Sequence, residues 1–230
     1  MNGKVKLFDK YIDNSLSKSI NWNDKLIQKY INDFTAENIR NNYVQGPYGN
    51  HVSVNLLQSF EDYNIKNMNV AVVGSLTPWI EAMLINMGNK VTTIEYNVPD
   101  CNYSKLDCKD YFEFFEKNKN TFDAVVTFSC VEHSGLGRYG DPLDPDGDLK
   151  TMECIYNNLK DDAILVWGGP VAKDALMWNA HRVYGEIRLP LIFNKFTELK
   201  WYGATKEELF PKRVKSRSNP YQPVVVLKKN

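Results

Sequence analysis

The chain has 230 residues, 43% of them apolar, and its 28 basic and 28 acidic residues give a formal charge of zero. A neutral chain offers no electrostatic reason to bind nucleic acid or an anionic membrane, and no apolar run approaches the ~20 residues of a membrane-spanning helix. The polar start MNGKVKLFDKYIDNSL does not resemble a signal peptide, so we expect a cytoplasmic protein with four reduced thiols, at Cys101, Cys108, Cys130 and Cys154.

Helical spacing of apolar residues dominates the N-terminal part of the sequence. Residues 22–42 predict an amphipathic helix with a break near Thr35, and residues 52–65 predict a second helix. The segment between them, QGPYGNH, is rich in turn formers. Residues 1–66 are therefore predicted to form a helical extension, either a lid over a ligand, to which Tyr48 and His51 would contribute, or a cap on a sheet edge.

From residue 69 onward, predicted strands alternate with predicted helices. The run NVAVVGS (69–75) is continuously apolar and β-branched, which is typical of a strand buried on both faces. A helix follows, with Thr77 as the candidate N-cap and Pro78 at its first position, and Gly88 ends it. The next strand spans 90–97, which completes one β-α-β unit.

The alternation continues to the end of the chain. Strands are predicted at 103–107, 122–129 and 163–169, and helices at 108–118 and 148–159. Strands at 197–203 and 223–229 have no crossover helix between them, which favours an antiparallel pair at one edge. Residues 67–230 are therefore predicted to form a doubly wound α/β domain with a mostly parallel, seven-stranded sheet and an antiparallel edge strand.

In open α/β sheets, ligands bind beyond the carboxyl ends of the strands. The residues predicted there are Gly74, Ser75, Glu95, Tyr96, Asp107 and Ser129. A carboxylate at Glu95 is placed to accept hydrogen bonds from ribose hydroxyls, and Asp107 could meet an adenine amino group. The alternative is that Gly74 makes a turn and Glu95 is a solvated strand end. The turn G-S-L-T-P-W lacks the second and third glycines of a dinucleotide site, which disfavours NAD.

The order VAVVGS, TTIEYN, KLD, FDAVVTFS, AILVWGG and the final strand pair resembles a class I S-adenosylmethionine-dependent methyltransferase, a Rossmann-like fold. More closely, VVGSLTPWIEAMLINMGNKVTTIEYN, EHSGLGRYGDPLDPDGD and NAHRVYGEIRLPLIF resemble the family "Caenorhabditis protein of unknown function", with bacterial members, over roughly residues 69–205. The resemblance implies S-adenosylmethionine as the cofactor, with Gly74 and Ser75 at its methionine end, Glu95 at the ribose and Asp107 at the adenine.

The loop SCVEHSGLGRYGDPLDPDGD (129–148) follows the fourth predicted strand, where the acceptor of such an enzyme would lie. His133 is the first candidate for a general base, because histidine titrates near neutral pH, and Glu132 could orient it. His181 is the rival base. Arg138 and Asp141 either contact the acceptor or pair with each other. The expected acceptor contacts are Arg138, Tyr139, Asp141, Arg182 and Tyr184.

A calcium site in DPLDPDGD fails the EF-hand pattern, because Leu149 stands where that loop needs glycine. Asp146 or Asp148 is instead expected to cap the next helix, and no metal site is predicted. The sequence favours O-methylation of a small polar acceptor, such as a sugar or glycan precursor. An NAD-dependent oxidoreductase, a catalytically silent binding protein and a nucleic-acid methyltransferase remain alternatives. The last would need a basic face, for which PKRVKSR (211–217) is the one candidate run.

Overall fold

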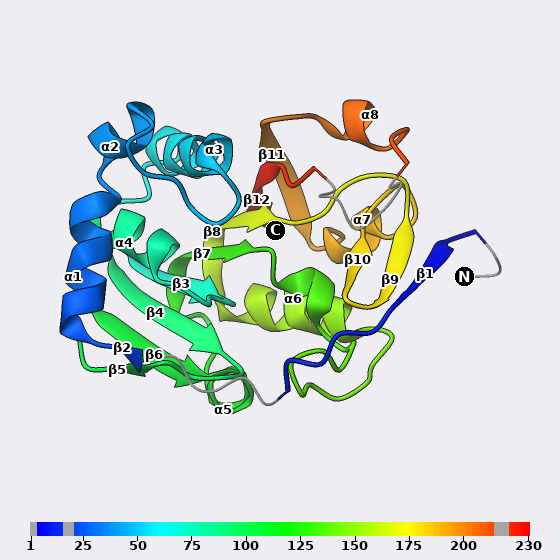
Figure 1. Ribbon diagram of the computed structural model, residues 1–230, viewed down its shortest axis with the longest axis horizontal. Helices are drawn as coiled ribbons and strands as arrows, with labels where there is room; N and C mark the ends of the chain where they lie inside the picture. The colour runs from blue at the N-terminus through cyan, green and yellow to red at the C-terminus, as the bar shows by residue number, and fades with distance from the viewer. Residues whose placement is uncertain (1–3, 16–20, 214–220) are drawn as a thin grey trace.

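A seven-stranded sheet forms the centre of the computed structural model, which describes residues 4–15, 21–213 and 221–230 (Figure 1). Its strands lie in the order β11-β12-β8-β7-β3-β4-β6. Their bounds are β3 Asn69–Val73, β4 Lys90–Glu95, β6 Leu106–Asp110, β7 Phe122–Phe128, β8 Leu159–Gly168, β11 Phe196–Tyr202 and β12 Val224–Lys229. Strand β12 runs antiparallel to β8 and β11, and the pairs β3–β4, β3–β7, β4–β6 and β7–β8 are parallel. The predicted doubly wound, mostly parallel sheet is confirmed.

The strand order places the switch point of the sheet between β3 and β7. From β3 the chain proceeds outward to β4 and β6, and it then returns to place β7 on the other side of β3. The connections therefore diverge between β3 and β7, which is the switch point at which such sheets bind ligands. Alternate residues of β3 face opposite layers, because Val70 and Val72 belong to one core cluster and Ala71 and Val73 to the other.

Helices cover both faces of the sheet (Figure 1). One face carries α1 (Asp24–Asp33), α2 (Ala36–Arg40), α3 (Asn50–Asp62) and α4 (Trp79–Asn86). The other carries α5 (Tyr111–Lys117), α6 (Gly147–Asn158), α7 (Leu189–Ile192) and α8 (Lys206–Leu209). No helix among the described residues is long and apolar enough to cross a membrane.

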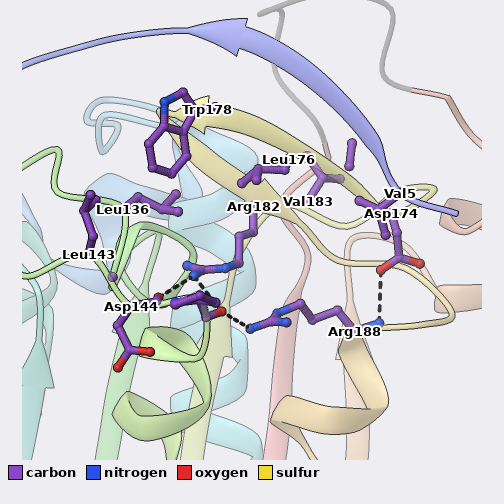
Figure 2. Close-up of a pocket in the computed structure, with 13 residues that line it drawn as sticks. Val5, Leu136, Leu143, Asp144, Asp174, Leu176, Trp178, Arg182, Val183 and Arg188 are labelled. Atoms are coloured by element: carbon purple, nitrogen blue, oxygen red, sulfur yellow. Dashed lines mark hydrogen bonds between the residues drawn. The ribbon is translucent and has the colours of Figure 1, made fainter. Parts of the chain in front are cut away.

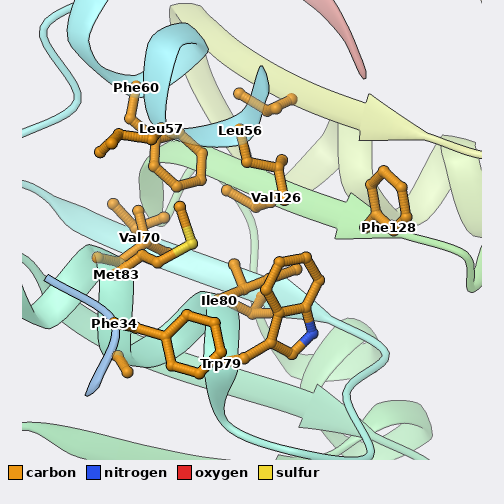
Figure 3. Packing of buried hydrophobic residues seen from close by; sticks show 14 of the residues in the cluster. Phe34, Leu56, Leu57, Phe60, Val70, Trp79, Ile80, Met83, Val126 and Phe128 are labelled. Carbon is orange, nitrogen blue, oxygen red and sulfur yellow. The ribbon is translucent and has the colours of Figure 1, made fainter. Parts of the chain in front are cut away.

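The predicted N-terminal helices join the core on one face of the sheet, where α3 contacts β12, α1 contacts α4 and α2 contacts α3. Figure 3 shows Leu56 of α3 near Val126 of the sheet and Phe34 beside Trp79 of α4, and these residues share one buried cluster. The break near Thr35 is confirmed, since the Thr35 side chain accepts from Asn38 N at 3.2 Å and caps α2. The boundary at residue 67 stays a prediction, although this shared core joins the two segments.

A small second sheet was not foreseen. Strand β1 (Lys6–Lys10) pairs in parallel with β9 (Ala175–Asn179), and β10 (His181–Val183) pairs with β9 on its other side. In addition, β2 (Asn21–Trp22) pairs with β5 (Asp100–Cys101). The N-terminal segment, for which a helical extension was expected, therefore also contains the strands β1 and β2.

Several predicted element ends are also corrected. The third strand of the sheet ends at Asp110, whose side chain caps α5, so Asp107 lies within the strand, paired with Thr92. Helix α4 has Pro78 at its N-cap, not Thr77. Asp146 occupies the N-cap of α6 but makes no side-chain capping bond. The basic run 211–217 lies partly outside the described residues.

Candidate functional site

A cavity of about 730 Å³ lies at the carboxyl ends of β3, β4 and β7, at the switch point of the sheet. Its volume is within the range of ~300–1,000 Å³ that is typical of small-molecule sites. The predicted site residues that line it are Gly74, Ser75, Glu95, Tyr96, Ser129, Glu132, His133, Arg138, Tyr139, Asp141 and His181. Eleven residues that were predicted from the sequence for the site therefore lie around one cavity.

One end of the cavity is built by the turn after β3 and the end of β4. Gly74 has a positive φ of 79°, and a Cβ placed there would lie 2.2 Å from Cys130 Sγ, so the turn requires glycine. Ser75 N donates to Glu95 Oε2 at 2.7 Å, and Tyr96 N donates to Glu95 Oε1 at 2.9 Å. Burial raises the pKa of Glu95, and the backbone N–H donors act in the opposite direction.

An aromatic surface continues this end of the cavity. The Tyr96 ring lies 4.5 Å from the ring of Tyr111 and 5.2 Å from that of Phe112, measured between centroids. A carboxylate that accepts from backbone N–H groups, next to the Tyr96 ring, suits a ribose and a heteroaromatic base. We call this end, formed by residues 74–77 and 95–97, the nucleoside end.

The opposite end begins at Glu132, in the 3-10 helix η1 (Val131–His133) that follows β7. Its side chain is fully buried, and Oε1 accepts from Ser129 Oγ at 2.8 Å. Its Oε2 has no hydrogen-bond partner within the described parts of the chain. Burial raises the pKa of Glu132 to about 7, so the carboxyl group titrates near neutral pH.

His133 is held in a defined tautomer. Its Nδ1 lies 2.5 Å from the carbonyl oxygen of Ala180, which can only accept, so Nδ1 carries the proton and Nε2 is left with a lone pair. Nε2 lies 3.7 Å from Glu132 Oε1. Burial lowers the pKa of His133 to about 3, and the charge of Arg138 adds to this effect. At neutral pH His133 is therefore an uncharged proton acceptor.

His181, in β10, lies beside His133, with 6.1 Å between the ring centroids. Burial and the nearby charge of Lys10 lower its pKa to about 4. Its Nε2 is buried without a partner among the residues that the structure describes. Arg138 bridges the two sides of this end, because Nε donates to Asn14 Oδ1 at 3.0 Å and Nη1 donates to Ala180 O at 3.3 Å. We call this end, which includes Glu132, His133, Arg138 and His181, the acceptor end.

Asp141 lines the cavity but uses its oxygens to hold the loop. Oδ2 accepts from Gly135 N at 2.7 Å and from Gly137 N at 3.2 Å, and Oδ1 accepts from Tyr139 N at 3.3 Å. Within the described part of the chain, Asp141 therefore bonds to backbone N–H groups and not to Arg138. These three hydrogen bonds stabilise the conformation of the loop between Gly135 and Asp141.

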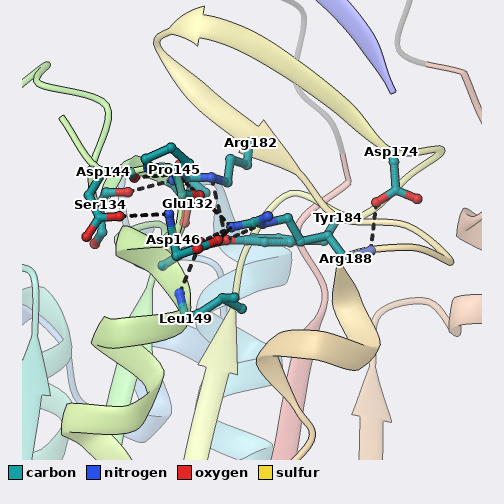
Figure 4. A network of polar contacts seen from close by, with 12 residues as sticks. Glu132, Ser134, Asp144, Pro145, Asp146, Leu149, Asp174, Arg182, Tyr184 and Arg188 are labelled. Carbon is teal, nitrogen blue, oxygen red and sulfur yellow. Dashed lines mark hydrogen bonds and ion pairs between the residues drawn. The ribbon is translucent and has the colours of Figure 1, made fainter. Parts of the chain in front are cut away.

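Arg182 and Tyr184, which were expected to contact the acceptor, lie outside the cavity lining. The Arg182 guanidinium donates to the carbonyl oxygens of Ser134 at 2.6 Å and Pro145 at 3.1 Å, and Tyr184 Oη donates to Asp148 Oδ2 at 3.2 Å (Figure 4). The correction has a physical cause: both side chains are buried beneath the loop, where its carbonyls and Asp148 are the partners within reach.

Asp107 also lies outside the cavity lining. Its side chain is half exposed, and its Oδ2 pairs with Lys109 Nζ at 3.0 Å. The prediction that Asp107 ends its strand was wrong, because the strand continues to Asp110.

Several lining residues were missed as site residues in the sequence. The N-terminal segment contributes Lys10, at the end of β1, and Ile12 and Asn14, which follow it. Strand β1 pairs with the distant β9, and no local sequence pattern predicts that pairing. Gln222 comes from the segment before β12. Tyr48, considered for a lid, does line the cavity, whereas the exposed His51 does not. In the described ranges, no group of three or more His, Cys, Asp or Glu residues is placed to hold a metal ion.

A smaller cavity of about 200 Å³ lies on the other side of the loop (Figure 2). Leu136, Leu176 and Val183 give it largely apolar walls. Its charged members are already engaged, since Asp174 accepts from Arg188 N at 3.0 Å and Arg188 pairs with Asp148. It lacks groups positioned for chemistry, so the larger cavity is the candidate site.

The sequence matches the profile of a known protein family. The profile of the family described as "Caenorhabditis protein of unknown function, DUF268" matches residues 67–230. No curated protein sequence matches the chain.

Solved structures resemble the chain in fold. A 1,6-didemethyltoxoflavin-N1-methyltransferase from Burkholderia thailandensis, with bound 1,6-didemethyltoxoflavin and S-adenosylhomocysteine, has a TM-score of 0.58 and 12% identity, over 89% of this chain and 87% of that one. The N-methyltransferase NodS from Bradyrhizobium japonicum, in complex with S-adenosyl-L-homocysteine, has a TM-score of 0.53 and 14% identity, over 90% of this chain and 99% of that one. At such identities the likeness concerns the fold, which is that of class I methyltransferases.

Proposed function

The chain belongs to the family described as "Caenorhabditis protein of unknown function", and from its fold and its cavity we propose that it is an S-adenosylmethionine-dependent methyltransferase. The observation that carries the proposal is a single cavity with a nucleoside end at Gly74 and Glu95 and a proton-accepting end at Glu132 and His133. A dinucleotide would need closer backbone approach than the single-glycine turn allows, which disfavours NAD.

The residues of the nucleoside end fit this cofactor. The Glu95 carboxylate suits ribose hydroxyls, the Tyr96 ring provides a surface for adenine, and the turn at Gly74 and Ser75 suits the amino acid end. Asp107 has no part in the proposal, since it lies outside the cavity. When bound, S-adenosylmethionine supplies an electrophilic methyl group on a sulfonium, and its product is S-adenosylhomocysteine.

The acceptor end is suited to a hydroxyl group, and we take the acceptor to be a small polar molecule such as a sugar or glycan precursor. His133 presents an unprotonated Nε2 that can take the hydroxyl proton as the oxygen becomes methylated. The ionised Glu132 carboxylate, 3.7 Å from that nitrogen, stabilises the resulting imidazolium. His181 and Tyr139 complete the wall around the acceptor.

We expect S-adenosylhomocysteine to bind, and Glu95→Ala to weaken its binding by about 10- to 100-fold, since hydrogen bonds to a charged group contribute about 1.5–3 kcal/mol. Isothermal titration calorimetry measures both values. Asp107→Ala is the matched control and should leave the affinity unchanged, because that carboxylate lies outside the cavity. Binding of NADH without binding of S-adenosylhomocysteine would instead support an oxidoreductase.

The pH dependence of kcat/KM should report Glu132. The rate should rise as the pH increases through about 7, because the Glu132 carboxyl group ionises there and its ionised form stabilises the imidazolium. Glu132→Gln should remove this step and leave a lower rate in the same pH range. The assay is conversion of S-adenosylmethionine to S-adenosylhomocysteine with the best acceptor from a screen of sugars, sugar acids and sugar phosphates. A step near pH 7 that persists in Glu132→Gln would refute the assignment.

A further inference from the structure

The acceptor end of the cavity contains two cationic side chains, Lys10 and Arg138. The charge of Lys10, at the end of β1, lowers the pKa of His181. The charge of Arg138, in the loop after β7, lowers the pKa of both His133 and His181. Because both imidazoles are uncharged at neutral pH, they add no positive charge of their own. The positively charged side chains that line the cavity are therefore those of Lys10 and Arg138.

Three acidic residues line the cavity, and within the described part of the chain none of them forms an ion pair with Arg138. Asp141 is committed to three backbone N–H groups of the loop. The buried Glu132 is partly protonated near neutral pH. Glu95 lies at the nucleoside end, hydrogen-bonded to Ser75 N. An anionic group on a ligand would therefore be favoured beside Arg138 and Lys10, and an ammonium group disfavoured.

Arg138 retains a donor that could hold such a group. Its Nε and Nη1 are used by Asn14 and Ala180, and these bonds fix the plane of the guanidinium. Its Nη2 donates to none of the residues that the structure describes. The guanidinium carbon also lies 4.9 Å from the centroid of the Tyr139 ring. A fixed guanidinium loses little conformational entropy on binding a carboxylate or phosphate.

The same end also carries buried polar atoms that lack partners. Glu132 Oε2, His181 Nε2 and Gln222 Oε1 make no hydrogen bond within residues 4–15, 21–213 and 221–230, and all three residues line the cavity. Two of these atoms are oxygens that accept, and Nε2 of a neutral histidine can accept as well. A buried polar atom left unpaired costs about 1–3 kcal/mol, so a ligand that donates hydrogen bonds here would recover part of that cost.

We propose that the acceptor is a hydroxylated anion, whose carboxylate or phosphate group binds Arg138 and Lys10 while its hydroxyls donate to the unpaired atoms of Glu132, His181 and Gln222. A sugar acid and a sugar phosphate both have this chemistry. The proposal rests on the proposed function, since it takes the acceptor to lie at the end of the cavity opposite Glu95.

The test is calorimetric titration of the protein saturated with S-adenosylhomocysteine. The probes are D-glucuronate, glucose 6-phosphate, glucose and glucosamine. At least one of the two anionic probes should bind at least tenfold more tightly than glucose, and the tighter of the two identifies carboxylate or phosphate as the bound group. Glucose or glucosamine binding as tightly as both anions would overturn the proposal, and so would the absence of binding by both anions.

Variants of Arg138 test whether the anionic probe binds in this cavity. Arg138→Leu should weaken binding of the anionic probe at least tenfold and leave the S-adenosylhomocysteine affinity within twofold, whereas Arg138→Lys should recover part of the loss. Arg40→Leu, which removes an exposed arginine paired with Glu61 outside the cavity, is the matched control. Equal binding by Arg138→Leu and the parent would overturn the proposal. If the parent protein does not bind S-adenosylhomocysteine, the proposed function itself is refuted. This result differs from failure of the anion proposal, in which S-adenosylhomocysteine binds but the anionic probes do not.

Discussion

Replacing His133 with alanine should lower kcat by about 10²- to 10⁴-fold, the usual contribution of a positioned general base. The affinity for S-adenosylhomocysteine should stay within twofold of the parent value. The separation is expected because His133 belongs to the acceptor end, hydrogen-bonded to Ala180 O, while Gly74 and Glu95 form the nucleoside end. Turnover of S-adenosylmethionine with the best acceptor, together with calorimetry, measures the two effects independently.

Two histidine variants serve as controls for His133→Ala. His51→Ala should leave kcat unchanged, because His51 is exposed and outside the cavity lining. His181→Ala should have a smaller effect than His133→Ala, since its Nδ1 lacks the carbonyl contact that fixes the tautomer of His133 in the described structure. A larger loss in His181→Ala than in His133→Ala would transfer the role of base to His181.

Replacing Asp148 with alanine should reduce the free energy of unfolding by about 3–5 kcal/mol, the loss expected when one member of a buried ion pair is removed. Arg188 donates to the Asp148 carboxylate at 2.8 and 2.5 Å, and Tyr184 Oη donates at 3.2 Å. Arg182 Nε lies 3.6 Å from the same carboxylate, and its side chain is 6% exposed. Without Asp148, the buried guanidinium of Arg182 would lose its counter-ion (Figure 4).

Denaturant-induced unfolding measures the effect of Asp148→Ala, and the neighbouring Asp146 provides a matched control. The Asp146 side chain is 62% exposed and lies 3.6 Å from Arg188 Nη2. Asp146→Ala should cost less than about 1 kcal/mol, because an exposed ion pair contributes little. Equal destabilisation by the two variants would contradict the role of Asp148 as the counter-ion of buried arginine side chains.

The central sheet could be predicted from sequence because its strands are buried on both faces. The runs NVAVV, FDAVVTF and AILVW consist mostly of apolar and β-branched residues, and they form β3, β7 and the second half of β8. The edge strand β6 has no such run, since Asp107 and Lys109 are exposed, and its predicted end at Asp107 was therefore wrong. The pairing of Lys6 with Ala175 joins distant segments, so no local pattern predicts it.

The site residues could be predicted where they lie at the ends of buried strands. Arg182 shows why another prediction failed. Gly74, Glu95 and Glu132 follow buried strands, so their neighbourhood in space could be inferred from the topology. Arg182 was assigned to the acceptor because it adjoins His181 in sequence. In β10, however, successive side chains point to opposite faces, and Arg182 faces the carbonyls of the loop while His181 lines the cavity. Sequence adjacency cannot distinguish the two faces.

The parallel pairing of β1 with β9 has a consequence for the order in which the protein is assembled. The nucleoside end is formed by one continuous stretch, β3-α4-β4, which a nascent chain can close early because contacts close in sequence form fastest. The acceptor end includes Lys10 and Asn14, which can take their places only after β9 and β10 have been synthesised and β1 has paired with β9. During synthesis the half that holds the nucleoside is therefore expected to take shape first, and the half that selects the acceptor closes only when the N-terminal strand has found its distant partner.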